Sequence, residues 1–273
     1  MKGSGRRVRP GILGWLSVGV LVLAVGIAIF APIIAPHEPT GGSILSQLEP
    51  PSSTHWLGTD IDGNDILSRL MYGARPSLLG PLLVVTLALL IGVPLALISA
   101  WKGGVFDQVI GRSLDLIFAF PTVLIAAIII LAIGRGITAA IIAVSIAYIP
   151  YTARITRAAA LRERNKPYII ACEVQGLSTT RIFIHHLLPN LSRFLTAQAT
   201  IAFGFALVDL AALSFVGIGI LPPAPDWGVM VGDTTSLVQG SYTSIAAAAV
   251  CILAVVAAFT IIGNRLSEGT ERR

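Results

Sequence analysis

Charged side chains are scarce in this sequence. They make up 12% of its 273 residues, whereas a soluble domain carries roughly 25%. So few charges cannot cover the surface of a globule of this length, and 55% of the residues are apolar. The composition therefore excludes a soluble domain and predicts an integral membrane protein.

Cysteine is rarer still, with only Cys172 and Cys251 in the whole chain. Two cysteines cannot form a disulfide framework. Cys172 is expected in a cytoplasmic loop and Cys251 within an apolar helix. The two thiols should therefore lie at different levels of the molecule and stay reduced.

Motifs for catalysis and nucleotide binding are absent. The sequence has no GxxxxGK(S/T) phosphate loop, so we do not expect this chain to bind ATP in the usual manner. It also has neither GxSxG nor HExxH. We therefore predict no catalytic residue in this chain.

Histidine is also sparse, and its placement does not favour a metal site. Adjacent residues on a helix point about 100° apart, so His185 and His186 are not expected to chelate one ion. His37 and His55 are read as isolated residues. Packing or capping is the preferred interpretation for all of them, and no metal ligand is predicted.

Long apolar runs dominate what is present. A transmembrane helix needs about 20 mostly apolar residues. The first run is longer than the core of a signal peptide and is read as a retained span. The predicted fold is an all-α membrane protein with six transmembrane helices, at Ile12–Ile34, Ser77–Ala100, Ser113–Ile133, Ile137–Thr156, Leu191–Gly219 and Tyr242–Gly263.

Breaks in these runs predict local shape. Gly134-Arg135-Gly136 is so short that the third and fourth spans should form a tight helical hairpin, and the fifth span is expected to break near its end. Pro94, Pro121 and Pro150 each interrupt a span and favour kinks. Kinks suit movable helices, but proline is also common in ordinary transmembrane helices.

The distribution of basic residues predicts the orientation. With both termini in the cytoplasm, only Arg69, Arg75 and Arg135 of the 19 Lys and Arg residues lie outside. Such an asymmetry is typical of multi-pass proteins. It also accounts for the formal charge of +5 and the sequence pI near 9.6 without a nucleic-acid partner.

Two outside segments are long enough to carry structure, residues 35–76 and 221–241. In the first, turn-forming residues are followed by Ile66–Tyr72, which reads as an amphipathic helix at the membrane surface. The second has a stiff proline-rich turn with Trp227 expected at the interface. We divide the chain into residues 1–76, comprising the N-terminal tail, first span and outside segment, and a five-helix core at 77–273.

The cytoplasmic loop at 157–190 carries the most local structure. Asn165 is a candidate helix cap, Pro167 suits a first turn, and Gly176 suits the left-handed position that ends a helix. The result is a helix of roughly ten residues, about 15 Å long, with Ile169, Ile170, Cys172 and Val174 as apolar contact surface. A helix resting on lipid headgroups is one interpretation, and docking to a partner is the other.

Acidic residues inside spans are candidates for function. Asp115 is expected to pair with Arg112 at i,i+3 near the cytoplasmic interface. Asp209 lies deeper, and no basic residue shares its span at helical spacing. It either lines a path through the membrane and meets a cationic group, or pairs with a partner chain.

Several segments carry a resemblance to a known family. YIIACEVQG (168–176) followed by HLLPN (186–190) resembles the EAA loop of bacterial ABC-importer permeases. HWLGTD with DGNDILSRLMYGARPSL (55–79), RSLDLIFAFP (112–121) and LSFVGIGILPPAPDWG (213–228) resemble the C-type permease subunit of dipeptide/oligopeptide importers. The resemblance covers residues 55–265 in order, and implies a type I ABC-importer permease fold with a cytoplasmic coupling helix.

The same resemblance implies partners and cargo. These are a second homologous permease, two ABC ATPase subunits that bind ATP and Mg, and an extracytoplasmic substrate-binding protein, all in a bacterial cytoplasmic membrane. The implied cargo is a dipeptide or oligopeptide, with nickel, glutathione or another small solute as the alternative within the same architecture. A self-sufficient secondary transporter or an intramembrane enzyme is the distant alternative.

The coupling-helix residues follow from the resemblance by position. They are Tyr168, Ile169, Ile170, Ala171, Cys172, Glu173, Gly176 and Leu177. The family's Glu-Ala-Ala is Ile170-Ala171-Cys172 here, so its acidic residue is missing, and Glu173 is a candidate substitute. The family's Gly-Arg-Asp is likewise Gly63-Asn64-Asp65.

Overall fold

The chain folds into a bundle of long helices with structured segments at both ends. A computed structural model describes residues 12–271, in which no β-strand is present. The basic residues of segments 1–11 and 272–273, used above for orientation, lie outside the described residues.

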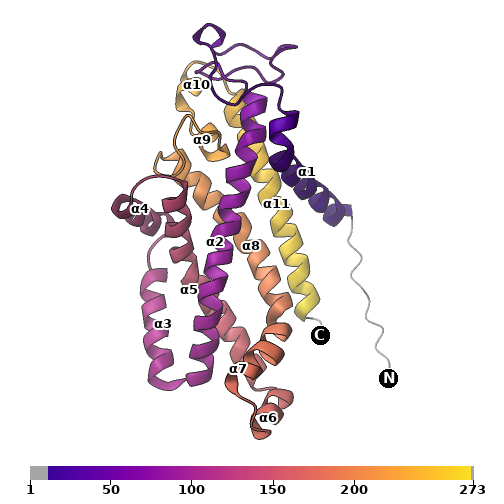
Figure 1. The fold of residues 1–273 in the computed structure, drawn as a ribbon, viewed down its shortest axis with the longest axis vertical. Helices are drawn as coiled ribbons and strands as arrows, with labels where there is room; N and C mark the ends of the chain where they lie inside the picture. Colours follow the sequence, from indigo (N-terminus) through magenta and orange to yellow (C-terminus); the bar gives the residue numbers. More distant parts are fainter. Residues whose placement is uncertain (1–11, 272–273) are drawn as a thin grey trace.

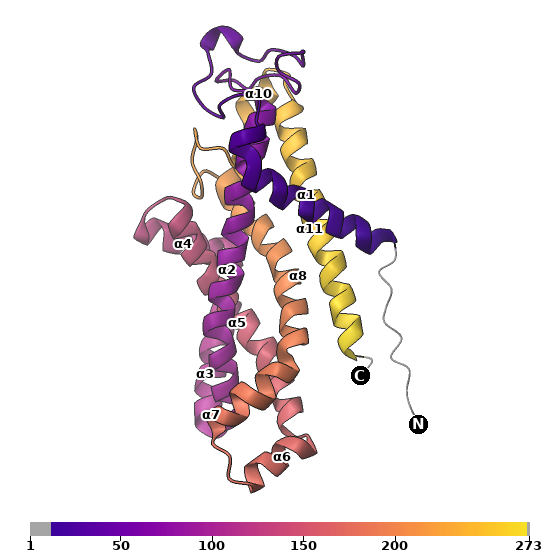
Figure 2. The ribbon, with the colours of Figure 1, turned by 45° about the vertical axis from the view of Figure 1, so that its right-hand side comes forward.

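Four long helices run along the long axis of the molecule (Figure 1). They are α2 (Ile66–Lys102), α5 (Ile137–Arg164), α8 (Leu188–Phe215) and α11 (Thr243–Glu271). Helix α2 packs mainly on α5, and α8 packs mainly on α11. Helix α1 (Ile12–Ile34) crosses obliquely against α2 and α11 (Figure 2).

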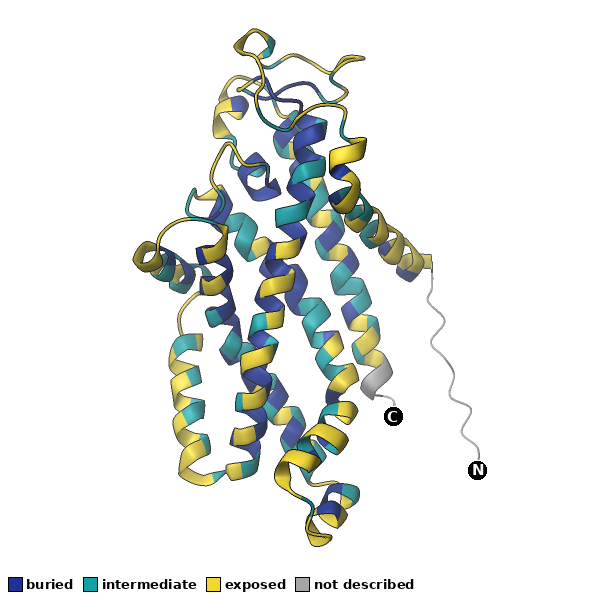
Figure 3. Cartoon of the chain, in the orientation of Figure 1, coloured by how far each residue is buried: buried dark blue, intermediate teal, exposed yellow. Residues whose placement is uncertain are grey.

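Small residues fill the centre of the bundle. Ala74, Ala143 and Ala206 are each fully buried, and small side chains allow helices to approach closely where lipid surrounds them. Large apolar residues such as Leu90 and Leu253 remain 66% and 68% exposed, and exposed residues line the outer faces of the helices in Figure 3. This inside-out pattern fits a lipid environment, and five helices, or six with one bent pair, are long and apolar enough to cross a membrane.

The bent pair replaces the third predicted span. Helices α3 (Gly104–Phe118) and α4 (Thr122–Ile133) meet at 89°, so the expectation of one helix over Ser113–Ile133 is wrong. Pro121 lacks an N–H and disfavours helical backbone at the residue before it, which ends α3. By contrast, Pro94 and Pro150 lie inside continuous helices.

One end of the bundle, here called the α6 end, is formed by the segment between α5 and α8. It contains α6 (Pro167–Val174), α7 (Thr179–Ile182) and the π-helical turn η2 (Phe183–Leu187). The opposite end carries residues 35–65 with the short η1 (Ile44–Ser46), together with α9 (Trp227–Val231) and α10 (Thr234–Val238).

Two expectations for the opposite end are wrong. Ile66–Tyr72 forms the first turns of α2 rather than a separate surface helix, because Asp65 caps α2 at Ser68 N and Ile66 is 1% exposed. Trp227 is 3% exposed, and its Nε1 donates to Leu70 O at 2.9 Å, so it is a core residue and not an interfacial one. The division placed at residue 76 falls within the continuous helix α2.

Candidate functional site

Helix α6 has sharply defined ends. Pro167 occupies its first turn as predicted, but the residue before the helix is Lys166, and Asn165 instead ends α5. The expectation that Asn165 caps α6 is therefore wrong. At the other end Gly176 has φ +74°, with Gly176 N donating to Glu173 O at 3.0 Å and Leu177 N to Cys172 O at 3.1 Å. These two bonds form a Schellman closure, so the predicted role of Gly176 as the terminating glycine is confirmed.

Two of the predicted coupling residues face inward. Ile169 is 0% exposed and Cys172 is 9% exposed, and both pack with Ile182 of α7. Trp101 and Leu177 close this small core from the side. Ile169 and Cys172 therefore hold α6 against its own chain, which leaves other residues to face outward.

The outward face of α6 is partly apolar. Ile170 is 48% exposed and Val174 is 83% exposed, and Ala171 and Glu173 are exposed beside them. We call these four residues the α6 face. An exposed apolar patch on a short, rigidly terminated helix is typical of a contact surface.

Arg164 ties α6 to the end of α2. Its Nη1 donates to Ala100 O and Trp101 O, both at 2.9 Å, and its guanidinium lies 4.5 Å from the centroid of the Trp101 ring. Its Nε lies 3.8 Å from Glu173 Oε1. Glu173 thus has a partner within its own chain, and any ion pair with another protein would compete with Arg164.

Tyr168 links three helices. Its hydroxyl donates to Glu163 Oε1 of α5 at 2.6 Å and accepts from Asn190 Nδ2 of α8 at 2.8 Å. Burial, with the hydrogen bond to Glu163, raises the pKa of the Tyr168 hydroxyl to about 12, so it stays a neutral donor. One side chain therefore joins α6 to both α5 and α8.

The adjacent histidines lie in the π-helical turn that leads into α8. The Nδ1 of His185 lies 3.3 Å from Arg181 O, which is the local backbone contact expected of a packing or capping role. His186 contributes its carbonyl to Asn190 Nδ2 at 2.9 Å.

Asp209 borders a cavity of about 380 Å³ at the bend between α3 and α4. Tyr148 of α5 donates its hydroxyl to Asp209 Oδ2 at 2.8 Å. Aromatic rings form much of the remaining wall, from Phe118, Phe120, Tyr151 and Phe205. A carboxylate with one hydrogen-bond donor, set among aromatic rings, suits a cationic group.

A second cavity of about 390 Å³ lies near the α6 end between α2, α3 and α5. Asp115 pairs here with Arg154 of α5, so its expected pairing with Arg112 is wrong. Asp107 is bound by both Arg157 and Ser99. Both carboxylates are therefore bound by residues of other helices, whereas sequence spacing could suggest only pairs within one helix.

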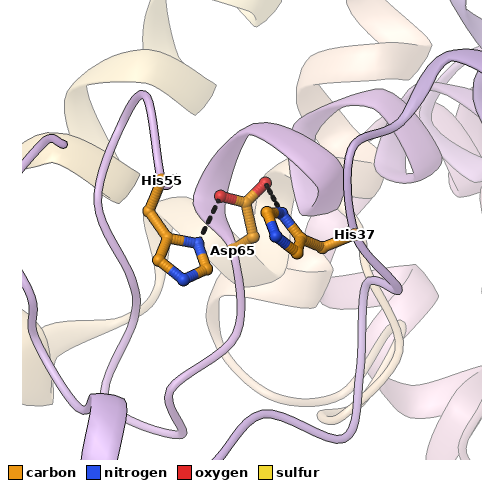
Figure 4. A group of neighbouring side chains, drawn as sticks. All are labelled: His37, His55 and Asp65. Atoms are coloured by element: carbon orange, nitrogen blue, oxygen red, sulfur yellow. Dashed lines mark hydrogen bonds and ion pairs between the residues drawn. The ribbon is translucent and has the colours of Figure 1, made fainter. Parts of the chain in front are cut away.

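Sequence reasoning missed partners that the fold supplies. Tyr148 sits in an apolar span without any local signal, yet it is the partner of Asp209. His37 and His55, expected to be isolated, have ring centroids 4.7 Å apart and lie beside Asp65 (Figure 4). These three residues could hold a metal ion, with one ligand atom from each lying within 4.8 Å of the others.

Comparison with known proteins agrees with this geometry. Residues 92–272 match the family described as binding-protein-dependent transport system inner membrane component. The dipeptide transport system permease protein DppC of Escherichia coli (strain K12) is 38% identical over 97% of this chain and 90% of that protein. DppC of Alkalihalophilus pseudofirmus is 36% identical over 93% of this chain and 84% of that protein.

A solved structure supports the fold. A chain of the inward-facing MetNI methionine ABC transporter superposes with a TM-score of 0.62 at 19% identity, covering 75% of this chain and 97% of that one. This likeness confirms the expected ABC-importer permease fold. Together with the family match over most of its length, it shows that this chain is a multi-pass membrane protein of the binding-protein-dependent transport system inner membrane component family.

Proposed function

We propose that the chain is the non-catalytic permease subunit of an ATP-driven importer of dipeptides or oligopeptides. The observation that carries the proposal is the identity of 34–38% with relatives named dipeptide transport permeases, over more than nine-tenths of this chain. Nickel or glutathione remains the alternative cargo that the architecture alone permits, and the names of the relatives do not favour it.

The proposed orientation places the α6 end in the cytoplasm of a bacterial cell. Among the described residues, Lys102, Arg112, Arg154, Arg157, Arg162, Arg164, Lys166, Arg181 and Arg193 belong to the α6-end segments. The opposite end carries Arg69 and Arg75 together with the acids Glu38, Glu49, Asp60, Asp62, Asp65, Asp226 and Asp233. Cytoplasmic segments carry the excess of Lys and Arg, so this gradient supports cytoplasmic termini.

The α6 face is the proposed dock for an ATPase subunit. Its exposed Ile170 and Val174 offer apolar contact, and the buried Ile169 and Cys172 keep the helix seated from behind. Two ATPases would bind one such helix from each of two homologous permeases, and ATP and Mg would belong to the ATPases. Closure of the ATPases would then displace α6 and, through Tyr168, the adjoining helices α5 and α8.

The cavity beside Asp209 is the proposed part of the cargo path in this chain. A peptide carries an α-ammonium group, which a carboxylate and aromatic faces attract together. The second permease would complete the path, and a substrate-binding protein would dock on segments 35–76 and 221–241. Alternating exposure of the path to the two sides of the membrane would complete the cycle.

The test is uptake by the assembly that co-purifies with this chain, reconstituted into lipid vesicles. We expect a radiolabelled dipeptide to accumulate only when ATP is supplied on the side of the ATPases and the binding protein on the other. Uptake of nickel or glutathione in place of dipeptide would contradict the proposed cargo. ATP-independent uptake would contradict the importer assignment itself.

A further inference from the structure

Three side chains from separate parts of the chain meet at the end opposite α6 (Figure 4). His37 follows α1, His55 lies in the loop that precedes α2, and Asp65 immediately precedes the first turn of α2. We propose that His37, His55 and Asp65 form a binding site for a divalent transition-metal ion of the zinc class.

The distances between ligand atoms are close to those of a metal site. His55 Nδ1 lies 3.0 Å from Asp65 Oδ1, and His37 Nδ1 lies 3.9 Å from Asp65 Oδ2. Zinc bonds of about 2.0–2.2 Å in tetrahedral geometry place ligand atoms about 3.4 Å apart. One ligand atom from each residue lies within 4.8 Å of the others, so closing the widest separation that this allows to about 3.4 Å takes a relative shift of about 1.4 Å, which rotation of the imidazole rings can supply.

Asp65 is already held in position for this role. Its side chain is 1% exposed, and its Oδ2 accepts from Ser68 N at 2.8 Å and from Ser68 Oγ at 2.7 Å. Those bonds occupy one oxygen and leave Oδ1 directed at His55. Hydrogen bonds to a ligating carboxylate are the usual support of a metal site.

Hydrogen bonding explains the position of the His55 ring but not that of the His37 ring, which packs on His55 and lies at ion-pair distance from Asp65 Oδ2. A hydrogen bond to Asp65 accounts for His55, but His37 Nδ1, at 3.9 Å, is too distant for one. Its backbone N donates to Ser68 Oγ at 3.1 Å, which fixes the start of the segment and brings the ring beside His55. A metal ion bridging the two rings and the carboxylate uses all three groups.

The site is open to an incoming ion. The side chain of His37 is 42% exposed and that of His55 is 18% exposed, whereas Asp65 lies beneath them. Two imidazoles and one carboxylate favour zinc, copper or nickel over magnesium or calcium, which prefer oxygen ligands. Three protein ligands leave a fourth position for water, as in open zinc sites.

Bound metal would cross-link the outside segment to the bundle. His37 and His55 flank residues 38–54, so one ion joins both ends of that stretch to the start of α2. Because the ion binds the folded arrangement and not the unfolded chain, it raises the stability of this end by RT ln(1 + c/Kd), where c is the concentration of free Zn²⁺.

The test is a titration of Zn²⁺ into the detergent-purified assembly in chelator-treated buffer, following thermal unfolding of this chain. We expect its unfolding midpoint to rise once free Zn²⁺ exceeds the Kd, and to continue rising with the logarithm of the Zn²⁺ concentration. His37→Ala keeps the backbone bond to Ser68 and should weaken the apparent zinc affinity at least about 10-fold, as losses of metal-site residues do. The matched control is His185→Ala, which removes a histidine at the other end of the molecule and should leave the zinc response unchanged.

A second measurement identifies the ligands directly. Co²⁺ bound to the assembly should give the visible absorption of a tetrahedral nitrogen and oxygen site, and His55→Gln, which retains a donor toward Asp65, should abolish it. A zinc response that His37→Ala leaves intact, a Co²⁺ spectrum that survives His55→Gln, or an unfolding midpoint that Zn²⁺ does not raise would each overturn the proposal.

Discussion

Replacing Gly176 by valine tests whether the closed end of α6 couples ATP hydrolysis to transport. A Cβ added at this position meets no heavy atom within 4 Å, so the space around the turn is open. The cost is conformational, because φ of +74° is left-handed backbone, which costs a residue with a side chain roughly 1–2 kcal/mol. Since 1.4 kcal/mol is a factor of ten, the closed turn should be depopulated about 5- to 30-fold relative to its open forms.

Gly240 provides a matched control. It has φ of +83° and open space around its Cα, and it closes α10 with the same pair of bonds, Gly240 N to Leu237 O and Ser241 N to Ser236 O. Gly240→Val therefore imposes the same local strain at the opposite end of the molecule.

The assay is the amount of cargo taken up per ATP hydrolysed in reconstituted vesicles, with amide hydrogen exchange of the turn measured alongside. The Gly176→Val variant should assemble normally. Hydrogen exchange at residue 176 and Leu177 should become about 5- to 30-fold faster, as the closed turn is depopulated, and the amount of cargo taken up per ATP should fall. Because Gly240 lies in the segment proposed to dock the substrate-binding protein, Gly240→Val is compared at saturating binding protein, where uptake per ATP should stay unchanged. An unaltered ratio in Gly176→Val, or an equal loss in both variants, would refute the reasoning.

Three further substitutions separate the tasks of neighbouring residues. Ile169→Ala removes a fully buried side chain and should destabilise the packing of α6 on its own chain by about 2–5 kcal/mol. Amide hydrogen exchange across α6 should become faster, and unchanged exchange would contradict the buried role of Ile169. Val174→Glu changes a side chain that is 83% exposed, so it should leave hydrogen exchange unchanged but weaken ATPase binding in a pull-down; full ATPase recovery would count against the α6 face. Tyr148→Phe removes the hydrogen bond to Asp209, typically worth about 1 kcal/mol, and should alter the KM for peptide more than that for ATP; identical kinetics would place the cavity outside the cargo path.

The sequence predicted the features that depend on local pattern. The first apolar run ends where α1 ends, at Ile34, because the length of an apolar run and the polar residues that follow it define a span. Gly176 was identifiable because ending a helix in left-handed backbone favours glycine. These features depend on short-range chemistry that the sequence displays directly.

The errors arose where two signals competed. The run Ser113–Ile133 is apolar enough for one span, but Pro121 ends the helix and turns it by 89°. Asn165 is a good helix cap in isolation, yet α5 continues as far as Arg164 and uses Asn165 as its own end. Hydropathy and cap preference do not determine which of two neighbouring helices takes a given residue.

The candidate sites depend on contacts between distant segments. Asp115 had an available partner three residues away, but the fold gives it Arg154, 39 residues along the chain. Tyr148 of α5 bonds to Asp209 of α8. His37, which follows α1, lies beside Asp65, which precedes α2. Such pairs follow only from how the helices pack, which spacing along one helix does not specify.

The central claim is that α6 binds an ATPase subunit and transmits the movement of that subunit to the helix bundle. The direct measurement is to place a photoreactive amino acid at Val174 on the α6 face, cross-link in native membranes, and identify the captured protein by mass spectrometry. The same residue at Leu253, 68% exposed on the outer face of α11, is the control. The account predicts that position 174 captures a subunit with a phosphate-loop motif and that position 253 does not. Capture of no ATPase from position 174, with the chain recovered alone or only with copies of itself, would contradict the account.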